Sequence, residues 1–147
     1  MDRFDERILQ ELKLNGRLSN VELATRIGLS PSATLRRVQE LEHNKTIVGY
    51  RAILNSVKQG IEFIAYVEIG LSDHSNAAQK HFELSIEGAK EVVECHNITG
   101  SKEYLLRVET TSLSAYKQFH SEVLGSIKQV QSISTSVVMD SPKDLRA

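Results

Sequence analysis

Hydrophobic residues recur every three or four positions in three stretches of the first third of the chain. This spacing places them on one face of a helix, because an α-helix completes a turn in about 3.6 residues. The pattern therefore predicts three amphipathic helices, at Asp2–Leu14, Ser19–Ile27 and Ser30–Leu41. Three helices of this length, joined by short turns, form a small domain with one shared apolar core.

The second and third of these helices carry signals for where they begin and end. Ser19 and Glu22 have the spacing of a capping box, in which each side chain accepts a hydrogen bond from the other residue's backbone amide. Gly28 follows the second helix, where the backbone leaves the helix in a left-handed conformation that suits glycine. Ser30 and Pro31 then open the third helix as a capping residue and a first-turn proline. The short turn predicts a helix-turn-helix.

The third helix has a polar face that includes two arginines. A helix that enters the major groove of DNA needs such side chains, because they bond phosphates and base edges. We predict a recognition helix whose DNA contacts come from Ser30, Ser32, Thr34, Arg36 and Arg37. Two alternatives stay open: the pair is a plain helical hairpin with a solvated face, or one arginine is structural, with Arg36 pairing to Glu40 four residues on.

The second half of the chain alternates between strand-like and helix-like patterns. Strands are predicted at Phe63–Leu71, Val92–Ile98, Glu103–Glu109 and Val130–Met139, and helices at Ser75–Ser85 and Ser114–Leu124. The order βαββαβ is that of a ferredoxin-like domain, an antiparallel sheet with both helices on one face. The predicted fold class is α+β, with the helix-turn-helix domain first. We expect the other face of the sheet to be open and apolar, and to be covered by a second copy in a homodimer.

The two predicted domains differ in charge. Residues 1–60 hold 10 Lys/Arg and 7 Asp/Glu, a net charge of +3, whereas residues 61–147 hold 8 and 12, a net charge of −4. A charge of +3 attracts phosphates weakly, so useful DNA affinity needs two or more copies on one duplex. Residues 47–54 favour either a two-stranded wing or an extended linker. We assign residues 1–60 to the DNA-binding domain with its linker and residues 61–147 to an oligomerisation and effector-binding domain.

Composition narrows the remaining classes of function. No apolar run approaches the roughly 20 residues that span a bilayer, and the first ten residues are too acidic for a signal peptide. We therefore expect no membrane partner and a cytoplasmic, nucleoid-associated location. The single cysteine, Cys95, is followed by His96, but adjacent strand residues point to opposite faces and no further ligand motif accompanies them. We predict no metal site, no cofactor, no catalytic residue and no enzyme activity.

Several stretches of the chain, taken together, resemble one family of bacterial and archaeal regulators. They read FDERILQELKLNGRLSNVELATRIGLSPSATLRRVQELE, IVGYRAILN, CHNITGSKEYLLRV and TSVVM, so that the likeness covers nearly the whole chain. The family is the leucine-responsive regulatory protein/asparagine synthetase regulator family, Lrp/AsnC. The resemblance implies a sequence-specific transcriptional regulator that binds double-stranded DNA and dimerises through its second domain. It also implies an assembly that is commonly an octamer of four dimers, with an amino acid often bound between dimers.

The resemblance further implies where such an effector would bind. The family's effector site lies at a hairpin and beside the last strand, which here correspond to Thr99, Gly100, Ser101, Lys102, Glu103, Tyr104, Thr135, Ser136 and Val137. A glycine turn offers amide donors to the carboxylate of a free amino acid, and the Glu103 carboxylate can accept its ammonium.

The sequence departs from the family pattern at two positions. The family usually has aspartate where Glu103 stands, and the longer side chain beside Lys102 could shrink the pocket, change the ligand or abolish binding. It commonly has glycine where Lys45 stands, so the left-handed residue after the recognition helix would fall on Asn44 or be strained, at a cost of about 1 kcal/mol. The alternative function is an amino-acid-binding oligomeric module whose helical domain serves assembly and does not read DNA.

Overall fold

The computed structural model describes residues 1–145, and the chain divides into two compact units, Met1–Ile53 and Leu54–Ala147. Each unit has a hydrophobic core of its own. The division falls a few residues before the predicted boundary at 60/61. The last two residues of the predicted second domain, 146–147, lie outside the described part of the chain.

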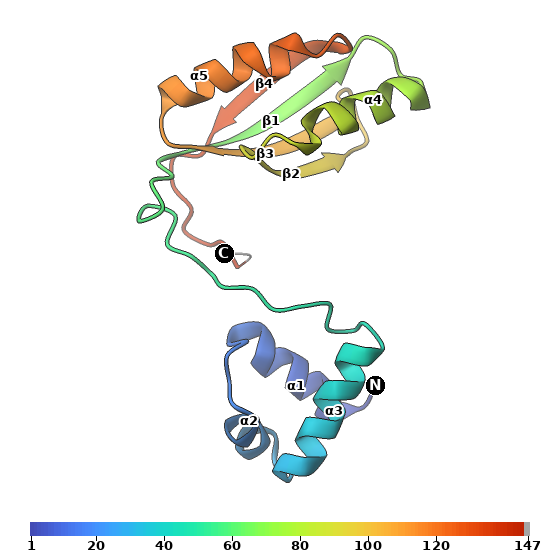
Figure 1. Ribbon diagram of the computed structural model, residues 1–147, viewed down its shortest axis with the longest axis vertical. Coiled ribbons are helices and arrows are strands. Elements are labelled where there is room, and N and C mark those ends of the chain that lie inside the picture. Colours follow the sequence, from blue (N-terminus) through green and yellow to red (C-terminus); the bar gives the residue numbers. More distant parts are fainter. Residues whose placement is uncertain (146–147) are drawn as a thin grey trace. The chain divides into compact units, whose positions relative to one another are not determined.

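Three helices form the first unit, as predicted: α1 (Arg3–Leu14), α2 (Asn20–Ile27) and α3 (Pro31–His43) (Figure 1). Each of the three contributes to one buried cluster, which consists of Ile8, Leu23, Ile27 and Leu41. The predicted spacing therefore identified the inward face of α1 and α2, whereas in α3 it found the buried Leu41 but missed the buried Thr34.

The predicted helix caps are present. The Ser19 hydroxyl accepts from the Glu22 amide at 3.1 Å, and the Glu22 carboxylate accepts from the Ser19 amide at 2.9 Å. Gly28 is left-handed, with φ 79°. The Ser30 hydroxyl accepts from the Ala33 amide at 3.2 Å, which fixes the start of α3 directly after the turn.

The end of α3 settles which residue is left-handed. Asn44 has φ −81°, whereas Lys45 has φ 65°. The expectation of an unstrained turn at Asn44 is wrong, and the strained alternative is confirmed. Asn44 instead uses its side-chain oxygen to accept from the Thr46 amide at 3.0 Å and from the Thr46 hydroxyl at 2.7 Å.

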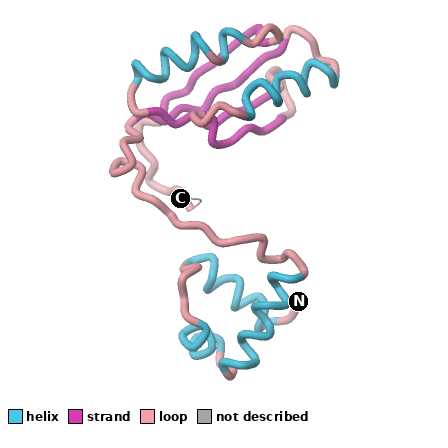
Figure 2. Tube along the Cα trace, in the orientation of Figure 1, coloured by secondary structure: helices cyan, strands magenta, loops and turns pink. Residues whose placement is uncertain are grey.

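The chain between α3 and the sheet is a linker that is extended over residues 48–54 and forms a hydrogen-bonded turn over residues 55–61. Residues 44–62, all of them described, contain no strand (Figure 2), so the two-stranded wing is wrong. Its apolar side chains Val48, Ile53 and Leu54 are exposed. High β-propensity did not produce a strand because none of the strands within residues 1–145 pairs with this segment.

The second unit is a four-stranded antiparallel sheet with two helices on one face (Figure 1). The strand order is β2-β3-β1-β4, which is the ferredoxin-like order. In chain order its elements are β1 (Phe63–Leu71), α4 (Asn76–Glu87), β2 (Val92–Asn97), β3 (Tyr104–Thr110), α5 (Leu113–Glu122), a short 3-10 helix η1 (Leu124–Ser126) and β4 (Val130–Val137). The predicted α+β fold class is correct.

The side of the sheet that faces α4 and α5 holds the larger core. Val67 on the central strand β1 is fully buried and pairs with Leu106 on β3 and with Thr135 on β4. Phe82 of α4 and Phe119 of α5 belong to the same buried cluster. Because strand side chains alternate, residues 63, 65, 67, 69 and 71 all point to the helices.

The opposite face of the sheet is mostly polar, with Ile64 and Leu105 among its few aliphatic side chains, so the expectation of an apolar open face is wrong. Arg107 of β3 lies at its centre and is only 5% exposed. Its guanidinium donates to the Tyr66 hydroxyl at 2.8 Å and to the Glu109 carboxylate at 3.0 Å. Across β1, Glu68 pairs with Ser134 and Tyr66 with Ser136. Charge pairs and hydroxyls cover the sheet where an apolar surface was expected.

Candidate functional site

The exposed face of α3 is the candidate DNA-binding surface. Ser32, Arg36 and Gln39 are all exposed and lie on the side of the helix opposite the buried Leu41. Ser30 is also exposed, and its hydroxyl lies 3.3 Å from that of Ser32 while it caps the helix. The surface therefore offers hydroxyl groups at the N-terminus of the helix and a guanidinium one turn further on.

Thr34 does not belong to this surface, and the prediction that it contacts DNA is wrong. Its side chain is fully buried, and its hydroxyl donates to the Ser30 carbonyl at 2.9 Å. The sequence held the signal for this, because Thr34 precedes Val38 by four residues and Leu41 by seven, which puts it on the apolar stripe. The prediction placed Thr34 on the polar face because its side chain carries a hydroxyl group.

Arg37 points to α1. Its Nη1 donates to the Asp2 carboxylate at 2.8 Å and to the Asp5 carboxylate at 3.0 Å, and the guanidinium lies 5.2 Å from the centre of the Phe4 ring. Bonding to Arg37 lowers the pKa of Asp2 below its ordinary value. Asp2 also caps α1 by accepting from the Phe4 amide at 2.9 Å. Arg37 thus holds α3 against the start of α1.

Arg36 makes no hydrogen bond or ion pair with the described residues, Glu40 included. The alternative that one arginine is structural is therefore correct, but with the roles exchanged: Arg37 is the structural one, and its partners come from α1. Arg36 is the arginine that stays available to a ligand.

The predicted effector residues on the hairpin between β2 and β3 fall into two groups. Thr99, Gly100 and Ser101 are exposed at its tip. The next three residues are anchored to other elements: Lys102 Nζ donates to Ser132 Oγ on β4 at 2.8 Å, and the Tyr104 hydroxyl, almost fully buried, bonds the Glu83 carboxylate on α4. Burial and the Glu83 carboxylate raise the pKa of Tyr104.

Glu103, the predicted partner of an effector ammonium, lies between these two anchors. Its Oε2 accepts from the Leu71 amide at 2.7 Å, and its Oε1 contacts Nδ1 of His74. The hydrogen bond from the Leu71 amide is the main cause that lowers the pKa of Glu103, and the contact with His74 adds to it. The carboxylate therefore remains ionised near neutral pH, as an ammonium partner requires.

The predicted effector residues on β4 point to both faces of the sheet. The Thr135 hydroxyl lies 2.5 Å from the Tyr116 hydroxyl of α5, and Val137 shares this face. Ser136 pairs with Tyr66 and points the other way. The structure therefore does not bring these three side chains together.

Sequence reasoning missed three residues that surround Glu103 and Lys102. A Cβ on Gly70 would lie 2.3 Å from Ser132 Oγ, so a side chain at this position would displace the hydroxyl that Lys102 bonds. A glycine inside a predicted strand is a signal for such a close approach. His74 carried no signal, because only the tertiary structure brings the loop after β1 to the hairpin.

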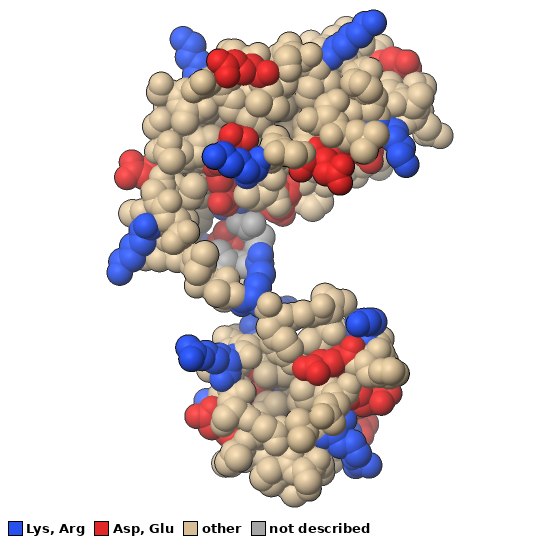
Figure 3. Space-filling model, in the orientation of Figure 1, with Lys and Arg blue, Asp and Glu red and all other residues tan. Residues whose placement is uncertain are grey.

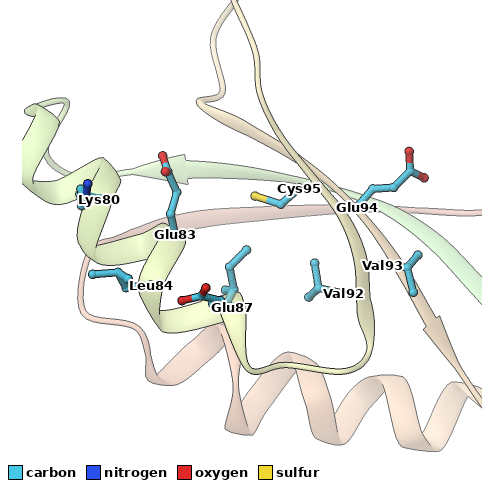
Figure 4. Close-up of a pocket in the computed structure, with 9 residues that line it drawn as sticks. Lys80, Glu83, Leu84, Glu87, Val92, Val93, Glu94 and Cys95 are labelled. Carbon is cyan, nitrogen blue, oxygen red and sulfur yellow. The ribbon is translucent and has the colours of Figure 1, made fainter. Parts of the chain in front are cut away.

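A separate groove of about 450 Å³ lies between α4 and the edge strand β2 (Figure 4). It includes Glu83, Leu84 and Cys95, and it contains no predicted effector residue. Partial burial and the Glu83 carboxylate raise the pKa of the Cys95 thiol, which opposes a role as a thiolate nucleophile. His96 contacts Glu94 at 3.2 Å on the other side of the strand.

Residues 1–145 contain no group of three or more His, Cys, Asp or Glu side chains arranged to hold a metal ion. No helix in this part of the chain is long and apolar enough to cross a membrane.

Both units match known protein families. Residues 1–42 match the AsnC-type helix-turn-helix domain, and residues 64–147 match the Lrp/AsnC ligand binding domain. The chain is 39% identical over 144 residues to a proline dehydrogenase transcriptional activator from Rhizobium radiobacter, covering 98% of this chain and 92% of that one. It is 38% identical over 143 residues to the leucine-responsive regulatory protein of Escherichia coli K12, covering 97% and 87%.

A solved structure agrees with these matches. A transcriptional regulator from Neisseria meningitidis, solved in complex with L-Met, superposes with a TM-score of 0.94 at 34% identity and covers 98% of this chain and 93% of that one. The two family matches follow the order of the two units, and the relatives align along nearly the full chain. Both observations point to the same family. The chain belongs to the Lrp/AsnC family of helix-turn-helix transcriptional regulators.

Proposed function

We propose that this regulator reads DNA with the exposed face of α3, through Ser30, Ser32 and Arg36. The observation that carries the proposal is the different state of the two neighbouring arginines: Arg37 is committed to Asp2 and Asp5, whereas Arg36 is exposed and unpaired among the described residues. A bidentate contact from one arginine to guanine contributes about 1–3 kcal/mol of discrimination between bases.

The proposal includes self-association and a cytoplasmic location. A DNA-binding unit whose net charge is only +3 over residues 1–60 depends on several copies to bind one duplex tightly. A homodimer, assembled further into an octamer of four dimers, would supply those copies. Family membership supports self-association. It also supports a cytoplasmic location, because a transcriptional regulator acts on the chromosome.

The proposal also includes an amino acid effector that binds near Glu103. Its support comes from two sources. The Glu103 carboxylate is held in place by the Leu71 amide and ionised. The related regulator from Neisseria meningitidis was solved with L-Met, and the E. coli relative is named for its response to leucine. A free amino acid therefore fits this site by chemistry and by likeness.

The DNA-binding proposal is tested with Arg36→Ala on the protein's own promoter fragment, across a salt series. We expect about a 5- to 100-fold loss of affinity and a shallower salt dependence, because a guanidinium that contacts base or phosphate is lost. Lys13→Ala is the matched control: it removes one positive charge from α1 in the same unit. Gel shift and fluorescence anisotropy give the dissociation constants.

The competing function, in which the helical unit serves only assembly, predicts a different result. In that case Arg36→Ala and Lys13→Ala would bind the promoter fragment equally, or the wild-type protein would show only weak, sequence-independent binding. Either result would remove the DNA-reading role of α3 and favour the assembly function.

A further inference from the structure

Three consecutive hairpin residues, Lys102, Glu103 and Tyr104, are each bonded to a different part of the sheet unit. Lys102 reaches Ser132 on β4, and Tyr104 reaches α4. Glu103 reaches the end of β1 and the loop that follows it. The Glu103 backbone is fixed as well, since its amide donates to Ile69 at 3.0 Å and its carbonyl accepts from Ile98 at 2.9 Å. The carboxylate is therefore positioned firmly before any ligand arrives.

The two oxygens of this carboxylate have partners of different kinds. Oε2 accepts from the backbone amide of Leu71, a residue only 1% exposed, at 2.7 Å. Oε1 contacts Nδ1 of His74, whose side chain is 77% exposed, while that of Glu103 is 13% exposed. One partner is a buried backbone group and the other is a surface side chain.

This difference decides which contact can be exchanged. A buried amide that loses its acceptor leaves an unsatisfied polar group, so the Leu71 contact is costly to break. An imidazole that is largely exposed can bond water when it leaves, so the His74 contact costs little to break. Oε1 is the position that a ligand can take over.

An ammonium group is chemically suited to that position. It presents a positive charge and three N–H donors, and the Glu103 Oε1 that now contacts a ring nitrogen of His74 can accept a hydrogen bond from it. The other charged groups nearby are committed: Lys102 Nζ bonds Ser132, and the Asp73 carboxylate accepts from the Ser75 amide at 2.9 Å. His74 is the one contact that must move.

We propose that His74 is a placeholder on Glu103 that the ammonium of an amino acid effector displaces, so that His74 sets the affinity of the effector site. This inference rests on the effector part of the proposed function. The ligand class is α-amino acids with a free ammonium, because an N-acylated amino acid has no cation to replace the ring.

The test measures binding of L-leucine and L-methionine to the full-length protein by isothermal titration calorimetry at pH 7.5. In His74→Ala, an amino acid that binds wild type should bind about two- to five-fold more tightly, since an exposed pair of this kind no longer has to be broken. His81→Ala is the matched control, because His81 is also exposed but its ring lies near the Ser85 hydroxyl (3.5 Å). Glu103→Gln should abolish binding in both backgrounds, and N-acetyl-L-methionine should not bind.

The outcomes separate this inference from the function on which it rests. Unchanged or weaker binding in His74→Ala, with wild type binding normally, would overturn the placeholder and leave the effector site standing. If neither amino acid binds wild type or His74→Ala, both the effector part and the placeholder fail. The DNA titration with Arg36→Ala then still decides the DNA-reading role by itself.

Discussion

Arg36 and Arg37 are neighbours in the sequence and face different surroundings. One helical step of about 100° turns Arg37 toward α1, where Asp2 and Asp5 hold it, and leaves Arg36 on the exposed face. The sequence indicated that one arginine is structural but not which one, because the partners lie more than thirty residues away. At the scale of single residues, function here depends on which polar side chains are already bonded to other parts of the protein.

The partners of the Glu103 carboxylate predict how the stability of the fold depends on pH. Its pKa is lowered below the reference value of 4.5, so the folded state favours the ionised form. This stabilisation is fully present above the unfolded pKa and is lost as pH falls through the lower, folded pKa. We expect Glu103→Gln to reduce the free energy of unfolding by about 1 kcal/mol at pH 7. The difference should shrink below about pH 4.5.

Urea unfolding of wild type and Glu103→Gln at pH 7, 4 and 3 measures this difference. A gap that stays constant down to pH 3 would contradict the assignment, because it would show that the loss does not come from the ionised carboxylate. Comparing the two proteins at each pH removes the contribution of every other carboxyl group.

At the scale of elements, the end of α3 places a lysine in a backbone conformation that favours glycine. The helix ends with the Lys45 amide donating to Glu42 at 3.1 Å and the Ile47 amide donating to Leu41 at 2.9 Å. These bonds require a left-handed residue between them, and lysine provides it at φ 65°. The chain keeps the turn because Ile47 packs on the core of the first unit.

Lys45→Gly should therefore stabilise the first unit. Glycine removes the left-handed strain but gains entropy in the unfolded chain, so the net increase in the free energy of unfolding is about 0.5–1 kcal/mol. Lys45→Ala is the control, since it removes the charge and long side chain but keeps the Cβ. Denaturant titrations that show equal gains for both variants would assign the effect to the side chain instead of the backbone.

At the scale of the molecule, Figure 3 shows Lys and Arg side chains scattered among Asp and Glu on the visible face. The DNA-binding unit has a small net charge, +3 over residues 1–60. Attraction to DNA must therefore come from a few positioned side chains and from several copies acting together, which is why the proposed function depends on both.

The two separate cores predict that the units unfold independently. Ile8 is fully buried in the first core, and its truncation to alanine costs about 2–5 kcal/mol. We expect Ile8→Ala to speed amide hydrogen exchange in α1, α2 and α3 and to leave β1 and β3 unchanged. Phe82→Ala is the reciprocal control in the second core. Faster exchange across both units in either variant would show that the chain unfolds as one.

The sequence by itself determined the elements and their order. Capping at Ser19 and Ser30, the glycine turn at Gly28 and the alternation along β1 are local signals, so they are readable without the fold. The family could be recognised for the same reason, since its motifs lie in continuous stretches of the chain.

Only the tertiary structure decided which polar side chains are free. It bonded Arg37 to α1, brought His74 to Glu103 and placed the nearly buried Arg107 on the sheet face opposite α4 and α5. Each of these outcomes depends on contacts between residues far apart in the chain, or on a neighbouring strand or helix. The periodicity of the sequence indicates which way a side chain points from its own helix or strand. Whether that side chain already has a bonding partner depends on which residues the rest of the fold places opposite it.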